Sequence, residues 1–176
     1  MENQVVLKAK KVKAIFTDVD GVLTDGSMFY AEGMNEHFKV FSVYDGVGVK
    51  MASICEIPVF FVSAKKSSLL HKRASELKVE KCFDGVENKR EIVLSVCKEY
   101  GFSSEEVCYL GDDLVDIQVL KIVGFPVAVS NAFDEVKKYA AYITQRKGGE
   151  GALREVIELI VKSRGCWEKV LSYFGG

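Results

Sequence analysis

Two carboxylates, Asp18 and Asp20, follow a short apolar run in the segment KAIFTDVDGVLTDG, residues 13–26. The run AIF, residues 14–16, predicts a buried strand of a parallel sheet. Ligands in open α/β sheets bind beyond the carboxyl ends of such strands. Gly21 interrupts the extended chain directly after the second acid, so the two side chains can take different directions. The pair therefore indicates a site rather than a solvated turn.

Other predicted strand ends carry polar groups that could join these acids. They are Ser63, Lys89, and the neighbouring Asp112 and Asp113. Each has a plain structural alternative: the acids could cap a helix, the serine could belong to a turn, and the lysine could be an exposed cation. What favours a site is their joint placement at the ends of strands expected to be neighbours.

Clustered carboxylates repel one another unless a cation lies between them. Two like charges about 4 Å apart repel by roughly 4 kcal/mol at an effective dielectric of about 20. Oxygen ligands favour Mg²⁺, which also accepts oxygens of a substrate phosphate as ligands. Phosphate esters are anionic, so a site for their hydrolysis must neutralise charge, align a nucleophile and protonate the leaving oxygen. The residue types are suited to Mg²⁺-dependent phosphoryl chemistry.

The elements that must position these residues alternate between strand and helix. Strands are expected at 14–16, 57–62, 81–83, 107–110, 126–129 and 141–144, and helices at 45–55, 67–78, 88–100, 112–123, 133–139 and 148–163. This order predicts an α/β fold with a doubly wound, mostly parallel sheet. The length of 176 residues suits one domain, 1–176.

Two segments depart from this alternation. Aromatic runs at 28–31 and 36–41 flank a glycine-containing turn and predict a protruding β-hairpin, about 27–41. Its apolar side chains exceed what a small hairpin can bury alone, which indicates a partner subunit. The C-terminal tail, 165–176, is expected to form an amphipathic helix that packs on its own domain or on a neighbouring subunit.

Composition excludes several classes of function. The 24 basic residues are balanced by 25 acidic ones, so neither nucleic acid nor an anionic membrane is expected as a partner. The sequence has neither an apolar stretch that could span a bilayer nor a signal-peptide core, so we expect a cytoplasmic protein. The five cysteines contain no CxxC and are expected to be buried, reduced thiols. His37 and His71 are expected at the surface or an interface.

The segment TDVDGVLTDG resembles the first motif of the haloacid dehalogenase superfamily of aspartate-nucleophile phosphatases, in its capless branch that acts on sugar-acid phosphates. Ser63, Lys89 and the pair Asp112 and Asp113 match the second, third and fourth motifs by residue type and order. The resemblance covers about residues 11–155. It implies a Rossmann-like fold without a cap domain, and a homotetramer in which hairpins and tails cover adjacent subunits' sites.

The resemblance also implies a role for each residue. Asp18 would be the nucleophile and a metal ligand. Asp20 would be the general acid and base, and its backbone carbonyl would bind Mg²⁺. Asp112 would bind the metal directly, and Asp113 would act through metal-bound water or by orienting Lys89. Asp116 would hold the loop, Ser63 would hydrogen-bond the phosphoryl group, and Lys89 would balance charge on the nucleophile and the phosphate.

The implied substrate is a phosphorylated eight- or nine-carbon sugar acid, foremost 3-deoxy-D-manno-octulosonate 8-phosphate. Lys65 keeps a positive charge where the branch uses arginine to hold the sugar carboxylate, but it lacks the bidentate fork, for which Lys66 or Arg73 could compensate. Tyr44 replaces another cation, whereas the segment GGEGALRE, residues 148–155, is intact. The alternatives are a nonulosonate 9-phosphate or broad small-phosphate phosphatase and, in another class, a non-catalytic oligomeric module that binds an anionic sugar.

Overall fold

The computed structural model describes residues 4–29, 32–33 and 38–176. Six strands form one sheet in the order β3-β2-β1-β4-β5-β6, and every neighbouring pair is parallel. Their bounds are β1 Ala14–Thr17, β2 Val59–Val62, β3 Lys81–Phe83, β4 Val107–Gly111, β5 Phe125–Ala128 and β6 Tyr142–Ile143. The first strand lies inside the sheet and the chain winds outward from it in both directions, which confirms the doubly wound α/β fold.

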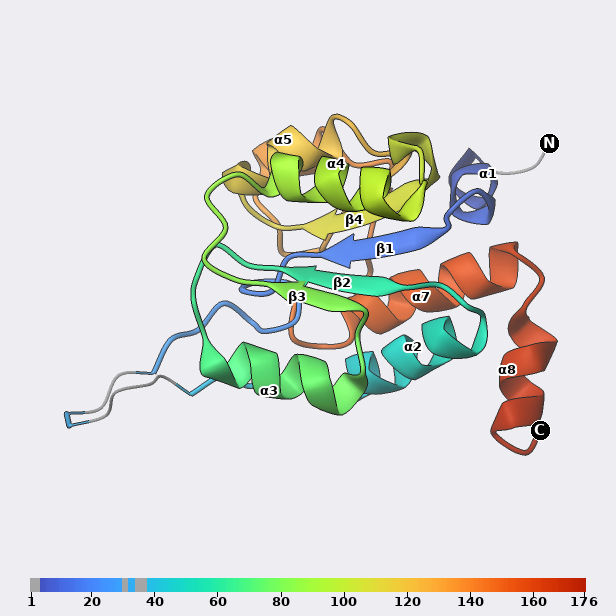
Figure 1. Cartoon of the computed structure of the whole chain (residues 1–176), viewed down its shortest axis with the longest axis horizontal. Coiled ribbons are helices and arrows are strands. Elements are labelled where there is room, and N and C mark those ends of the chain that lie inside the picture. Colours follow the sequence, from blue (N-terminus) through green and yellow to red (C-terminus); the bar gives the residue numbers. More distant parts are fainter. Residues whose placement is uncertain (1–3, 30–31, 34–37) are drawn as a thin grey trace.

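Helices cover both faces of this sheet. Figure 1 shows α4 and α5 on one side and α2, α3 and α7 on the other. The helices are α1 Gln4–Lys10, α2 Val43–Ile54, α3 Ser68–Leu77, α4 Lys89–Tyr100, α5 Ile117–Leu120, α6 Asp134–Lys137, α7 Ala152–Ser163 and α8 Trp167–Tyr173, with short 3₁₀ helices η1 Ser104–Glu106 and η2 Leu114–Asp116. The two layers explain why four of the strands are apolar on both faces.

The core lies between these layers. Every residue of β1, β2, β4 and β5 is buried. Phe16 and Phe60 stack with ring centroids 4.5 Å apart, across the β1–β2 pairing. Burial of such strands on both faces explains the near-continuous apolar runs in the sequence.

Local capping residues set several helix boundaries where the sequence predicts them. The side chains of Ser67 and Asn88 accept backbone hydrogen bonds at the starts of α3 and α4. Gly101 ends α4 in the left-handed conformation, and Ser103 forms a capping box at η1.

Some boundaries differ from the expected ones, for local reasons. The helix expected at 45–55 begins at Val43 because the Ser42 side chain caps it. The last helix begins only at Ala152 because Gly149 and Gly151 have φ of 76° and 93°. The expected helix 112–123 is divided into η2 and α5. Helix α1 was not predicted.

The hairpin and the tail are less regular than the sheet. An antiparallel bridge joins Phe29 to Phe38, while the rest of the predicted hairpin lies partly outside the described residues, at 30–31 and 34–37. Helix α8 buries Val170 and part of Trp167 against the domain's own core, whereas Phe174 stays 56% exposed. The described part of the chain includes no cap domain and no helix with the length and apolar character that a bilayer crossing requires.

Candidate active site

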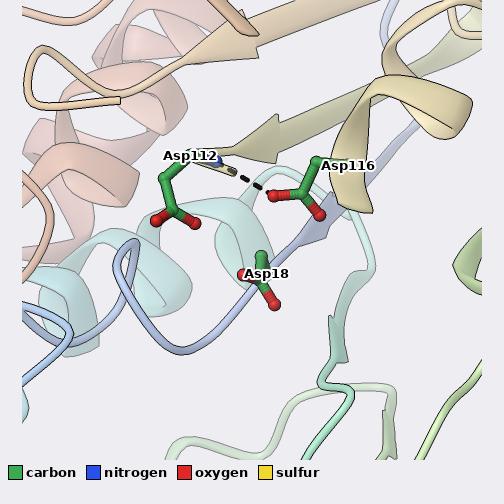
Figure 2. A group of neighbouring side chains, drawn as sticks. All are labelled: Asp18, Asp112 and Asp116. Carbon is green, nitrogen blue, oxygen red and sulfur yellow. Dashed lines mark hydrogen bonds between the residues drawn. The ribbon is translucent and has the colours of Figure 1, made fainter. Parts of the chain in front are cut away.

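Three carboxylates meet at the carboxyl edge of the sheet. One oxygen from each of Asp18, Asp112 and Asp116 lies within 4.8 Å of the other two. Figure 2 shows the three side chains converging, with Asp18 at the end of β1 and Asp112 at the end of β4. The parallel pairing of these two strands brings the acids together. Just beyond β1, the Asp18 N–H donates a hydrogen bond of 2.9 Å to the Leu110 carbonyl of β4, which extends this pairing.

The electrostatics of this acid centre, defined as Asp18, Asp112 and Asp116, favour a divalent cation. Burial, reinforced by the charge of Asp116, raises the pKa of Asp18 to about 6. Burial and then the charges of Asp18 and Asp116 raise the pKa of Asp112 to about 8. The Oδ1 atom of Asp112 is buried and has no hydrogen-bond partner. A hard cation would relieve the repulsion and satisfy this oxygen, so the residues fit Mg²⁺.

Lys89 places a buried cation between two of these acids. Its Nζ lies 2.7 Å from Asp18 Oδ1 and 2.8 Å from Asp116 Oδ1, and its side chain is 2% exposed. Burial acts to lower the pKa of Lys89, but Asp18 and Asp116 raise it above its ordinary value. Lys89 therefore remains an ammonium group beside the predicted nucleophile.

Asp116, rather than Asp113, orients Lys89, which corrects one of the two roles expected for Asp113. The Asp113 side chain is exposed and caps η2, accepting a hydrogen bond from the Leu114 N–H at 2.6 Å. The capping-box turn directs Asp116 inward instead, where it is fully buried. Asp116 also holds the loop, as expected, because its Oδ2 accepts from the Asp112 N–H at 3.0 Å (Figure 2).

Asp20 lies beside the acid centre and has partners of its own. The Ser63 hydroxyl, at the end of β2, donates to Asp20 Oδ2 at 3.4 Å. The Lys39 ammonium, from the hairpin, forms an ion pair with Asp20 Oδ1. Lys39 was not predicted, and nothing in its local sequence marks it, because the contact joins residues 19 positions apart.

A cavity of about 350 Å³ opens beside Asp20. Its lining includes the ammonium-bearing side chains of Lys39, Lys65 and Lys66 and several serines. The Lys65 Nζ lies 2.7 Å from the sulfur of Met28, a weak acceptor, so the ammonium can still bind a stronger one. Two acids, Asp20 and Asp84, share this lining, and Asp84 already accepts a hydrogen bond from the Ser67 N–H at 2.9 Å.

The structure does not bring Arg73 into this cavity. Its Nη2 donates to the Ser42 carbonyl at 3.2 Å, and its Nη1 lies 3.5 Å from Glu76. The guanidinium also faces the Phe41 ring at 5.8 Å and lines a separate groove beside α2. Of the three predicted substrate residues, Lys65 and Lys66 therefore share the cavity and Arg73 lies apart.

Glycines allow two loops to pack tightly around the acids. Gly21 has φ of 100°, and a Cβ there would lie 2.1 Å from Asp112 Oδ2. A Cβ on Gly148 would lie 1.7 Å from the Gly21 carbonyl oxygen, and the Gly149 N–H donates to the Val22 carbonyl at 3.0 Å. The loop that precedes α7 thus supports the turn that carries Asp20.

Comparison with known proteins agrees with this geometry. Residues 63–156 match the model of the haloacid dehalogenase-like hydrolases. The chain is 35% identical over 161 residues to the 3-deoxy-D-manno-octulosonate 8-phosphate phosphatase of Escherichia coli K12, covering 92% of this chain and 85% of that protein. The chain belongs to the haloacid dehalogenase-like hydrolases.

Solved structures of such hydrolases have the same fold. The 3-deoxy-D-manno-octulosonate 8-phosphate phosphatase of Moraxella catarrhalis, in complex with magnesium, phosphate and the sugar acid, superimposes with a TM-score of 0.94 at 31% identity, covering 99% of both chains. The cobalt-bound deoxy-D-mannose-octulosonate 8-phosphate phosphatase of Haemophilus influenzae superimposes with a TM-score of 0.85 at 34% identity, covering 90% of this chain and 92% of that one. The region matched by the haloacid dehalogenase-like model contains Ser63, Lys89 and Asp112. Asp18 and Asp20 precede it and are placed by the geometry above.

Proposed function

We propose that this protein is a Mg²⁺-dependent phosphatase that hydrolyses 3-deoxy-D-manno-octulosonate 8-phosphate to the free sugar acid and phosphate. The observation that carries the proposal is the buried Asp18, which lies 2.7 Å from the Lys89 ammonium and within 4.8 Å of Asp112. The 35% identity between this chain and a 3-deoxy-D-manno-octulosonate 8-phosphate phosphatase supports the same proposal.

In the first step Asp18 would attack phosphorus, forming an aspartyl-phosphate as the bond to the sugar oxygen breaks. Asp20 would donate a proton to that leaving oxygen. In the second step Asp20 would take a proton from water, which attacks the same phosphorus and releases Asp18 and phosphate. Lys89 would offset negative charge on Asp18 and on the phosphoryl group. Ser63 would donate a hydrogen bond to the phosphoryl group.

Magnesium would be held by the carboxylates of Asp18 and Asp112 and by the backbone carbonyl of Asp20. The unpartnered, buried Oδ1 of Asp112 supports this assignment. When bound, Mg²⁺ supplies charge neutralisation for the transferring phosphoryl group. The exposed Asp113 would act through metal-bound water.

The cavity beside Asp20 is proposed to hold the sugar acid. Its volume of about 350 Å³ is within the usual range for small-molecule sites. Lys65 and Lys66 would bind the sugar carboxylate through charge-assisted hydrogen bonds. A nonulosonate 9-phosphate also carries a carboxylate and a phosphate ester and is the second candidate substrate.

We further propose a homotetramer that works in the cytoplasm. Phe29, Phe38 and Val40 of the hairpin are all more than half exposed, and so is Val43 at the start of α2, which together is more apolar surface than such a segment usually leaves in water. The five cysteines are free, which suits a reducing compartment; three of them are buried as expected, whereas Cys82 and Cys166 are half-buried. Analytical ultracentrifugation at micromolar concentration tests the assembly, and a stable monomer would contradict it.

A substrate panel tests the function. Phosphate release from 3-deoxy-D-manno-octulosonate 8-phosphate, a nonulosonate 9-phosphate, neutral sugar phosphates and an aryl phosphate would be measured with Mg²⁺ and with a chelator. We expect metal-dependent release that is fastest with the first compound. Faster turnover of neutral sugar phosphates would reject the sugar-acid assignment. Binding without release from any compound would favour a non-catalytic sugar-phosphate module.

A further inference from the structure

Asp116 lies at the centre of a buried hydrogen-bond network. Its Oδ1 accepts from the Lys89 ammonium at 2.8 Å and from the Tyr109 hydroxyl at 2.7 Å. Its Oδ2 accepts from the backbone N–H groups of Asp112 at 3.0 Å and Asp113 at 3.4 Å. One carboxylate thus connects the cation beside Asp18 to the loop that carries Asp112.

Strand β4 provides the space for this network. Tyr109 and Gly111 are two residues apart and so face the same side of the sheet. A Cβ on Gly111 would lie 2.5 Å from Asp116 Cβ, so the glycine leaves room for the acid. Tyr109 and Asp116 are both fully buried, and neither can exchange its partner for bulk water.

The Tyr109 hydroxyl satisfies Asp116 without adding charge. Burial, followed by the charges of Asp116 and Asp18, raises the pKa of Tyr109 well above its usual value, so the hydroxyl keeps its proton and donates it. A second cation at this position would oppose the binding of a divalent metal nearby. Without any donor from Tyr109, the Lys89 ammonium would be drawn toward Asp116 and away from Asp18.

We propose that Tyr109 is a positioning residue for phosphoryl transfer. Its hydroxyl fixes Asp116 so that Lys89 is shared with Asp18 while the Asp112 loop keeps its place. The inference rests on the proposed function and deepens it. Tyr109 does not line the cavity beside Asp20, so substrate binding does not depend on it.

The variant Tyr109→Phe keeps the ring and removes the hydroxyl. We expect kcat to fall about tenfold, or about 1.4 kcal/mol, with KM within twofold of wild type, at a temperature well below the melting point. The matched control is Tyr100→Phe, which removes a hydroxyl 2.8 Å from Glu80, away from the site. That control should stay within twofold in both constants.

Two further readouts separate positioning from general damage. In a Lys89→Met background, Tyr109→Phe should lower kcat less than twofold, because its effect passes through Lys89. Calorimetry with Mg²⁺ alone should show at least threefold weaker binding to Tyr109→Phe than to wild type. This measurement still tests the inference if the wild-type protein releases no phosphate, a result that would reject the proposed function.

An unchanged kcat in Tyr109→Phe, an equal tenfold loss in the Lys89→Met background, or unchanged Mg²⁺ affinity would each overturn the proposal. If Tyr109→Phe does not fold, Asp116→Asn tests the same network with the side-chain shape retained. It should lower kcat at least tenfold with KM unchanged. An Asp116→Asn enzyme with wild-type kcat would overturn the proposal equally.

Discussion

The acid centre and the cavity beside Asp20 lie at the same edge of the sheet but hold their charges differently. Asp18 and Asp116 of the acid centre, together with the Lys89 ammonium between them, have side chains no more than 8% exposed and are joined by ion pairs within one chain. In the cavity, the Lys65 and Lys66 side chains are exposed. The groups proposed to act on phosphorus are thus buried and ion-paired, whereas the side chains proposed to bind the sugar acid are long and solvated.

The largest effect expected from this contrast follows from changing Asp18, the proposed nucleophile. Asp18→Asn keeps the side-chain shape and removes the attacking oxygen anion, so turnover should fall by roughly 10⁴-fold or more. Phosphate release and the melting temperature, measured together, check this. The melting temperature without metal should not fall, because burial and Asp116 raise the pKa of Asp18 despite its ion pair with Lys89, so the charge that is removed is net unfavourable in the folded protein. Activity within tenfold of wild type would refute the nucleophile assignment.

A change in the cavity should instead alter specificity. Lys65→Met should raise KM for the sugar-acid phosphate by roughly 10- to 100-fold, the loss of one charge-assisted hydrogen bond. KM for a neutral sugar phosphate should change less than threefold. Lys65→Arg is the matched control and should lower KM for the sugar acid, because arginine adds a bidentate fork. Equal effects on acidic and neutral substrates would remove the distinction between the two regions.

Lys39 connects the two regions and should have an intermediate effect. Lys39→Met removes the ion pair to Asp20, and we expect kcat to fall about tenfold. Lys39→Arg should recover most of this loss. Lys50→Met removes a lysine that faces the Tyr173 ring, outside the site, and serves as the control. Wild-type kcat in Lys39→Met would show that the ion pair is incidental.

The smallest effect is on stability and depends on pH. Asp45, in the first turn of α2, is buried outside the acid centre and accepts a hydrogen bond from the Arg154 N–H at 2.9 Å. The folded-state pKa values of Asp18, Asp45 and Asp112 lie above the ordinary 3.8, at about 6, 6 and 8. The folded protein therefore binds more protons than the unfolded chain from about pH 4 to 8, and it loses stability as pH rises through that range.

With a chelator, the melting temperature should be a few degrees lower at pH 8 than at pH 5.5. For a protein of this size, each kcal/mol lost from the free energy of unfolding lowers the melting temperature by about 2–4 °C. Mg²⁺ binds the ionised acids, so the stabilisation it gives should increase with pH. Asp112→Asn should flatten the trend measured with the chelator. A melting temperature that rises with pH in the chelator would contradict the raised pKa values.

Much of this arrangement could be predicted from the sequence because parallel strands end at one edge. The runs before Asp18, Ser63 and Asp112 predict buried strands, and their order fixes where these side chains meet. The choice of Asp116 over Asp113 as the partner of Lys89 could not be predicted. It depends on a capping-box turn, and both acids suit a cap.

Long-range contacts that involve irregular segments also could not be predicted from the sequence. Lys39 reaches Asp20 from a hairpin in which only the Phe29–Phe38 bridge is paired among the described residues. Arg73 lies within α3, yet its guanidinium donates a hydrogen bond to the Ser42 carbonyl, which precedes α2. Such contacts depend on the tertiary path of a loop, which hydrophobic periodicity does not specify.

The contact between Gly148 and Gly21 has a consequence for exchanging parts between related enzymes. The two glycines are separated by most of the chain, yet no side chain fits between them, so the shapes of their loops are matched. A chimera that takes residues 145–176 from one relative and the first 26 from another would join surfaces that were shaped independently. These two terminal pieces should therefore be transferred together.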